Sequence, residues 1–230
     1  MANVKKFSNM KDIGHLCAHY ERSVAKGHYG NPDIDEERLE EDNTNLAPNR
    51  GKQTYYIKQQ IEEIMVGRTL RKDAVRMCCW VVDAPKRLPE EKKEAFFQTV
   101  YDFLIDRYGR KSGMGEDVCV SAYIHKSETT DHIHFAFLPV VERNGKKSFC
   151  AKEAVGREDL KTFHEDLAKK LEEKGICQKS DILNGATQRD SSGRALSVKQ
   201  LKRNRAMERE RKVDRWTNQI DRTERKISRW

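Results

Sequence analysis

The chain lacks any long apolar run, and this absence excludes a membrane-spanning helix, which needs about 20 consecutive apolar residues. Charged residues make up 36% of the 230 residues. The first residues also lack the apolar stretch of a secretory signal. We therefore expect one large domain, or one domain with an appendage, in the cytoplasm.

The six cysteines are scattered, and none forms a C-x-x-C pair. This spacing speaks against a zinc knot built from paired thiolates. Several of the cysteines lie in apolar runs that we expect to be strands. We interpret them as reduced, buried thiols of a cytosolic protein rather than as a disulfide framework.

Most of the chain also lacks an excess of either charge. The net charge is +8, but residues 1–198 carry only +1, whereas residues 199–230 hold 12 Lys and Arg against 5 Asp and Glu, a net +7. Such a segment is typical of a contact with nucleic acid or another polyanion, although a solvated helix with incidental charge explains the composition equally well.

An apolar stripe runs along the same basic segment at spacings of three, four and seven residues. It consists of Val213, Trp216, Ile220, Ile227 and Trp230. The spacing predicts a helix over 198–230 that follows a linker at 181–197 and packs on the domain, on a second copy in a homodimer, or on another protein. The stripe reaches the last residue without a stop signal, as expected of a chain cut from a longer protein.

Three of the seven histidines, His125, His132 and His134, lie within ten residues. Side chains two apart in a strand share a face, so His132 and His134 point the same way. His125 ends the preceding apolar run, on the side opposite to Val118, Val120, Ala122 and Ile124. If the two runs pair as antiparallel neighbours, the three imidazoles converge.

Three neutral imidazoles around one divalent cation leave coordination positions open, which is the layout of a catalytic metal site. A histidine on a strand is usually just a polar-face residue. The position of these three at the end of one strand and the start of the next nevertheless favours a metal site.

The remaining pattern predicts an α+β fold, an antiparallel sheet with helices mainly on one face. Strands are expected at 3–8, 75–82, within 118–141, and at 146–150 after the Asn144-Gly145 turn. Helices are expected at 53–66, at 89–108 with Gly109 as the cap, and at 157–174 ended by Gly175. Residues 12–26 are expected to form either a helix or a loop. Residues 27–52 are expected to form a long irregular connection.

Three ordered segments resemble the plasmid mobilisation and recombination proteins, the Pre/Mob or MobV-type relaxases of the HUH endonuclease superfamily. The first is His19-Tyr20-Glu21-Arg22, similar to an H-x-x-R motif. The second is Arg71-Lys72-Asp73-Ala74-Val75, and the third is the histidine cluster with Glu128. Asn43, with 45–48, resembles a weaker motif. The resemblance covers about residues 3–180, and we expect residues 1–180 to form the relaxase domain.

The resemblance implies metal-dependent, strand-specific nicking and joining of DNA at an origin of transfer, for mobilisation of a plasmid or transposon. The cut strand stays covalently attached to the enzyme. The resemblance implies Mn²⁺ or Mg²⁺ on His125, His132 and His134, and a single-stranded or hairpin DNA partner. It also implies that a protein partner of the C-terminal helix would belong to the conjugation machinery. Arg22, Asn43, Arg71 and Lys72 match positions that can hold DNA, because Lys and Arg contacts to phosphate position a strand.

Two neighbouring residues compete for the role of nucleophile. Most HUH enzymes use tyrosine, whereas the MobV type is associated with the histidine of its first motif, which corresponds to His19. Adjacent side chains point in different directions, so only one of His19 and Tyr20 can face the metal, and the resemblance favours His19. Glu128 could orient a ligand histidine or accept a proton. Ser127 and Asp131 stand where the family often has Asp and Pro, and Asp131 adds a carboxylate beside the site.

The sequence is also compatible with two other classes of function. One is a metal-dependent phosphoesterase that uses water, which His19 and Tyr20 argue against. The other is a non-catalytic DNA-binding protein with a structural metal. A structural site is normally closed by a fourth Cys or His, and no cysteine lies in the window 120–149.

Overall fold

The computed structural model describes residues 2–23, 34, 35, 37, 39, 44–183, 192, 196, 200, 203, 204, 207 and 211. The chain divides into two compact units, Met1–Asn184 and Gly185–Trp230. In the second unit, the described residues from 200 onward are helical, and the predicted apolar stripe from Val213 to Trp230 lies outside the described residues. Within the described part of the chain, no helix is long and apolar enough to cross a membrane.

Five strands of the first unit form one antiparallel sheet in the order β1-β3-β5-β4-β2. Their bounds are β1 (Ala2–Phe7), β2 (Thr44–Asn45), β3 (Met77–Asp83), β4 (Cys119–His125) and β5 (His132–Phe137). Every residue of β5 is buried, so side chains on both faces of the sheet need a cover.

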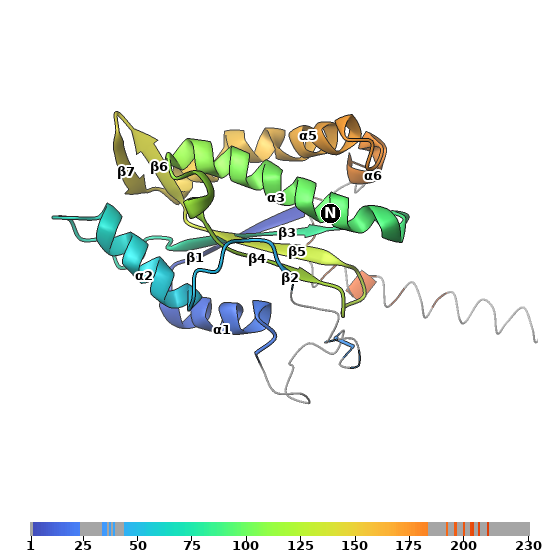
Figure 1. The fold of residues 1–230 in the computed structure, drawn as a ribbon, viewed down its shortest axis with the longest axis horizontal. Helices are drawn as coiled ribbons and strands as arrows, with labels where there is room; N and C mark the ends of the chain where they lie inside the picture. The colour runs from blue at the N-terminus through green and yellow to red at the C-terminus, as the bar shows by residue number, and fades with distance from the viewer. Residues whose placement is uncertain are drawn as a thin grey trace, which may run out of the picture. The chain divides into compact units, whose positions relative to one another are not determined.

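Helices supply that cover on both faces, and the α+β class predicted from sequence is confirmed. The helices are α1 (Met10–Tyr20), α2 (Gln53–Ile64), α3 (Glu90–Ser112), α4 (Ala151–Ala154), α5 (Arg157–Glu173) and α6 (Lys179–Leu183). The longest pair, α3 and α5, lies on one face, as expected of helices gathered mainly on one side. However, α1 and α2 cover the opposite face (Figure 1).

The sheet therefore separates two apolar cores. On the α3 and α5 side, Trp80 stacks on Phe163 with ring centroids 3.6 Å apart, and its indole N–H donates to the Tyr108 hydroxyl at 2.7 Å. On the other side, Ile13 and Ile57 pack against the sheet from α1 and α2. Each fully buried side chain of this size stabilises the fold by about 1.5–3 kcal/mol.

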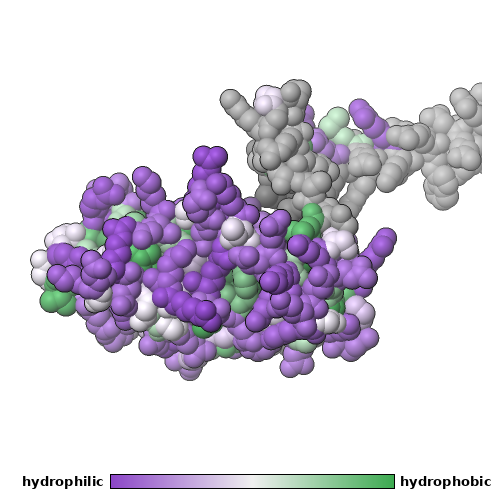
Figure 2. Space-filling view, turned by 90° about the horizontal axis from the view of Figure 1, so that it is seen from above, coloured by the Kyte–Doolittle hydropathy of each residue, from purple (hydrophilic) through white to green (hydrophobic). Residues whose placement is uncertain are grey.

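The outer surface over α3 and α5 is mainly hydrophilic, with apolar residues scattered among polar ones (Figure 2). This is the pattern of amphipathic helices that turn one side to a core. All six cysteines are free, and four of them are buried.

Two details of the sequence prediction were wrong. Val120 lies in the core on the α1 side, because a bulge between Cys119 and Ser121 shifts the alternation of β4. Helix α3 continues past Gly109 to Ser112, and the left-handed residue that ends it is Gly113, at φ 63°. Gly109 has a different reason to be glycine, since a Cβ there would lie 2.5 Å from the Gly115 carbonyl oxygen.

The predicted Asn144-Gly145 turn is confirmed. It joins β6 (Val140–Arg143) to β7 (Lys146–Phe149) in a separate two-stranded sheet. Asn144 and Gly145 both have positive φ, 50° and 73°, as a two-residue hairpin of matching twist requires. The end of α5 is also as predicted, with Gly175 at φ 66° just beyond it.

Candidate active site

Pairing of β4 with β5 places His125 directly opposite His132, and Tyr123 opposite His134. The three histidines therefore share the face of the sheet that α1 covers. His125 is fully buried, and His132 and His134 are 7% and 8% exposed. The His134 ring centroid lies 4.7 Å from those of His125 and His132, which are 5.4 Å apart. The structure thus brings together the three imidazoles that the sequence singled out.

Backbone carbonyls orient two of these rings. Nε2 of His125 lies 3.0 Å from the carbonyl oxygen of Tyr20, and Nδ1 of His132 lies 2.8 Å from that of Thr130. A carbonyl only accepts, so each of these nitrogens donates its proton. The lone pair is then on Nδ1 of His125 and on Nε2 of His132, where it can bind a metal.

The free nitrogens fit a divalent cation. Nε2 of His132 and Nε2 of His134 are 3.0 Å apart, about the separation of neighbouring ligand atoms on a cation that binds nitrogen at about 2.1 Å. Nδ1 of His125 and Nδ1 of His134 are buried and have no hydrogen-bond partner in the described part of the chain. Two lone pairs at 3.0 Å repel each other unless a proton or a cation lies between them.

Burial keeps the imidazoles of His125 and His134 neutral. It lowers the pKa of His125 to about 2, and it holds the pKa of His134 well below its ordinary value, with neighbouring histidines adding to the effect. A neutral imidazole is the form that binds a metal ion. The electrostatics of the site therefore agree with the arrangement of its nitrogens.

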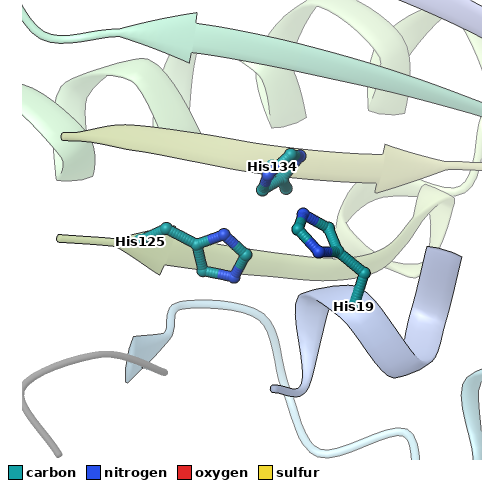
Figure 3. A group of neighbouring side chains, drawn as sticks. All are labelled: His19, His125 and His134. Atoms are coloured by element: carbon teal, nitrogen blue, oxygen red, sulfur yellow. The ribbon is translucent and has the colours of Figure 1, made fainter. Parts of the chain in front are cut away.

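A fourth histidine joins the cluster from α1. The Asn9 side chain caps this helix by accepting from the Lys11 amide, and Ile13 and Cys17 anchor it on the sheet. His19, in the last turn, is thereby brought to ring centroid distances of 5.4 Å from both His125 and His134 (Figure 3). One nitrogen of each of these three rings lies within 4.8 Å of the others.

The Tyr20 ring packs against this cluster, but its hydroxyl is buried in the core beside Cys79. Its side chain is only 2% exposed, its ring stacks on His134 at 4.6 Å, and its hydroxyl forms a hydrogen bond with the Cys79 thiol. Burial, the thiol and Cys17 raise the pKa of Tyr20 far above the ordinary value. The phenolate that a tyrosine nucleophile needs is therefore strongly disfavoured here.

Glu128 lies at the edge of the cluster, where Oε1 is 3.9 Å from Nδ1 of His125. The same oxygen accepts a hydrogen bond of 2.9 Å from the Arg22 guanidinium, and Arg22 also donates to the Ser127 hydroxyl at 3.4 Å. The sequence predicts Arg22 as a phosphate ligand, but its side chain is only 2% exposed and is directed at Glu128. Arg22 adopts φ 50°, which turns the chain after α1 toward this contact.

A family model described as plasmid recombination enzyme, Mob_Pre, matches residues 1–182. The chain belongs to this family. A plasmid recombination enzyme of Streptococcus agalactiae is 32% identical over 133 residues, 56% of this chain and 25% of that protein. One of Bacillus thuringiensis is 27% identical over 202 residues, 86% of this chain and 42% of that protein.

Solved structures give the same relationship. A Mn-bound MobM relaxase domain with oriT DNA of plasmid pMV158 superposes with a TM-score of 0.70 and 26% identity, over 89% of this chain and 97% of that chain. A second Mn-bound complex of MobM gives 0.67 and 27%, over 88% and 98%. The chain spans between a quarter and about half of the length of the curated Mob_Pre relatives that it matches.

Two further motif residues of this Mob_Pre chain, Arg71 and Lys72, do not join the cluster. Arg71 and Lys72 are exposed and lie before β3, whereas His132 pairs with Asp83 at the far end of that strand. Arg71 forms an exposed ion pair with Asp73 at 3.6 Å. Asn43 lies outside the described residues.

Sequence reasoning missed the backbone groups of the site. The carbonyls of Tyr20 and Thr130 orient His125 and His132. Every residue has a carbonyl, so no residue type in a sequence signals such a contact. Sequence reasoning also missed the pairing of Arg22 with Glu128, two residues separated by 106 positions. The H-x-x-R spacing was a signal for Arg22 but did not indicate its partner.

Proposed function

We propose that this chain nicks and joins one DNA strand at an origin of transfer, through a covalent protein–DNA intermediate, for mobilisation of a plasmid or transposon. The observation that carries the proposal is the position of His19, a neutral and partly exposed imidazole, beside three further buried histidines. Membership of the plasmid recombination enzyme family, and the similarity to MobM bound to oriT DNA, support the same activity.

In this proposal His125, His132 and His134 hold one divalent cation, Mn²⁺ or Mg²⁺, and the relatives of known structure contain Mn. When bound, the cation supplies Lewis-acid polarisation of a phosphate oxygen and stabilises the charge of the transition state. Backbone carbonyls already orient the His125 and His132 rings, so little reorganisation is needed when DNA arrives.

His19 is the proposed nucleophile. Burial, with Arg22 adding to it, lowers the pKa of His19, so its ring is neutral at neutral pH and carries a lone pair. That nitrogen attacks phosphorus while the bond from phosphorus to the 3′ oxygen breaks. The 5′ phosphoryl group is then held on His19 as a phosphoramidate, and the 3′ oxygen leaves with the bonding electron pair and takes a proton from water to become a hydroxyl. An incoming 3′ hydroxyl reverses the step and rejoins the strand.

Glu128 is proposed to stabilise the charge that develops on His19. Its carboxylate acts to raise the His19 pKa, against the larger lowering by burial and Arg22, so it lies close enough to favour a positive ring. A histidine that attacks phosphorus becomes positively charged in the adduct. Arg22 holds the carboxylate in place through the bond of 2.9 Å.

DNA contacts outside the cluster complete the proposal. Arg71 and Lys72 are exposed and are available to phosphates of the bound strand or hairpin. Asn43 is proposed to contact the DNA as well, as its motif position predicts. The basic segment 199–230 is proposed to bind neighbouring phosphates, while its stripe packs on the domain, on a second copy, or on a partner of the transfer machinery. The reaction on plasmid DNA places the protein in the cytoplasm.

A covalent adduct tests the function directly. The full chain is incubated with Mn²⁺ and a labelled single-stranded oligonucleotide that carries the origin of transfer, denatured, and separated on a gel. We expect a labelled band at the mass of protein plus DNA, with the protein on the 5′ side of the break. Cleaved DNA that runs free of protein and ends in an ordinary phosphate would instead identify a hydrolase that uses water.

A further inference from the structure

The loop 126–131 joins the two strands that carry the histidine cluster, and contacts from both faces of the sheet hold it. At its start, Arg22 from the end of α1 binds Ser127 and Glu128. At its end, Lys93 from the first turn of α3 reaches Asp131 from the opposite face. The contact through Lys93 has no part in the reaction proposed above.

Lys93 makes two ion pairs that differ in their surroundings. Its Nζ lies 2.6 Å from Oδ2 of Asp131 and 2.5 Å from Oε2 of Glu90. The Asp131 side chain is 11% exposed and that of Glu90 is 73% exposed. Water screens the pair with Glu90, whereas a charge on Asp131 would be poorly solvated without its cation.

Asp131 is also fixed through its backbone. Its carbonyl accepts a hydrogen bond of 2.8 Å from the amide of Ala84, just beyond β3. Residue 131 is thus held at its carboxylate by α3 and at its carbonyl by the chain that leaves β3. Asp131 belongs to neither group of described residues whose ligand atoms lie close enough to share a metal ion.

The peptide plane before Asp131 contains the carbonyl of Thr130. A peptide bond is planar, so a fixed Asp131 restricts the direction of that carbonyl. The Thr130 carbonyl accepts a hydrogen bond of 2.8 Å from the Nδ1–H of His132. This contact directs Nε2 of His132 toward His134. A continuous path of contacts therefore runs from Lys93 to a nitrogen of the metal site.

We propose that Lys93 is a positioning residue of the metal site, which holds Asp131, and through it the Thr130 carbonyl, so that His132 presents Nε2 to the cation. The inference rests on the proposed metal role of His132. It assigns to Asp131 a structural charge that Lys93 neutralises, rather than a place among the metal ligands.

Metal affinity of the full chain without DNA tests this proposal. Lys93→Met keeps the length of the side chain and removes its charge, and Asp131→Asn keeps the shape and removes the opposite charge. Groups that orient a ligand histidine change metal affinity by about 10–100-fold, and we expect the lower end, roughly tenfold weaker Mn²⁺ binding, for either variant. Glu90→Gln is the matched control, because it removes the exposed partner of the same lysine, and it should bind Mn²⁺ as the wild type does.

Two further variants separate positioning from general stability. Lys93→Arg keeps the positive charge that Lys93→Met removes, and it should keep most of the wild-type Mn²⁺ affinity. The double variant Lys93→Met/Asp131→Asn should bind Mn²⁺ no more weakly than the weaker single variant, because both changes break one contact. The melting temperature of each protein with EDTA shows whether it is folded, and Asp131→Asn serves alone if Lys93→Met does not fold.

Wild-type Mn²⁺ affinity in a folded Lys93→Met or Asp131→Asn protein would overturn the proposal. So would an equal loss of affinity in Glu90→Gln, since the effect would then not run through Asp131. The adduct assay on the wild type reports separately on the function. A wild type that binds Mn²⁺ but forms no adduct refutes the nicking reaction and leaves the role of Lys93 to be decided by the affinity ratios.

Discussion

The backbone carbonyl of Tyr20 binds Nε2 of His125 across 3.0 Å, while the Tyr20 side chain enters the core beside Cys79. One residue thus contributes to the histidine cluster through its backbone and to the α1 side of the core through its ring. The preceding residue, His19, is left to face the cluster.

The first prediction separates these two neighbours as nucleophiles. His19→Ala should reduce adduct formation by roughly 100-fold or more, because it removes the attacking atom. Tyr20→Phe loses one buried hydrogen bond, about 1 kcal/mol of stability, and should keep most of the activity. Adduct yield on a gel measures both, and the wild-type link should be acid-labile, as a phosphoramidate is. Full adduct yield from His19→Ala would show that another residue attacks.

The second prediction concerns the metal ligands. Removing the His132 imidazole takes away one of three proposed ligands, so His132→Ala should greatly weaken Mn²⁺ binding and stop cleavage. The double variant His132→Ala/His134→Ala should bind none. Titration calorimetry with the DNA-free protein measures the affinity. His15→Ala is the control, since His15 is exposed on α1, and unchanged metal content in the double variant would contradict the assignment.

The third prediction concerns pH and a histidine away from the site. Burial lowers the pKa of His164, whose Nε2 lies 3.3 Å from the Ala2 carbonyl oxygen. In the unfolded chain, His164 becomes protonated below about pH 6.5. In the folded chain, its protonation requires a lower pH. The stability contributed by neutral His164 is therefore complete above about pH 6.5 and is lost as the pH falls below that value.

His164→Gln should accordingly show a smaller loss of unfolding free energy between neutral pH and pH 5 than the wild type. Urea denaturation with EDTA present, at a series of pH values, measures the difference. His15→Gln, the same change at an exposed position of α1, controls for the effect of the substitution itself. Identical pH slopes for wild type and His164→Gln would show that His164 is as easily protonated in the fold as in the unfolded chain.

The fourth prediction concerns the end of α3. Gly113 has φ 63°, and a Cβ placed on it would overlap the Glu142 carboxylate. Gly51 has the same φ with nothing within 4 Å of the added atom. The exposed Glu142 side chain can turn away, so Gly51→Ala and Gly113→Ala should each cost about the conformational term, about 1–2 kcal/mol. Melting temperatures of the two variants measure these costs, and a larger loss in Gly113→Ala that added Glu142→Ala removes would show that the carboxylate is held in place.

The fifth prediction concerns the basic segment. A chain that ends at Ser197 loses the net +7 of residues 199–230. Each lost phosphate contact flattens the slope of log affinity against log salt by about 0.7–0.9. The truncated protein should bind origin DNA more weakly and with a shallower slope, while its Mn²⁺ affinity is unchanged. The same affinity and slope in both proteins would leave the apolar stripe, rather than the charge, as the feature to explain.

Local patterns in the sequence determined the parts of the structure that depend on near neighbours. His132 and His134 share a face because strand side chains alternate, whatever the strand packs against. Asn144 and Gly145 form a turn because both tolerate positive φ. The family resemblance added His19 to the site, although no periodicity placed that residue near the strands.

Only the tertiary structure decided which distant residues meet. The insertion of β3 between β1 and β5, the bulge that turns Val120 to the other core, and the pairing of Arg22 with Glu128 all depend on contacts between segments far apart in the chain. A charge that the packed fold buries needs a partner, and Glu128 supplies it for Arg22. The interaction that fixes Arg22 therefore comes from the packed fold, and the four residues of its motif do not contain it.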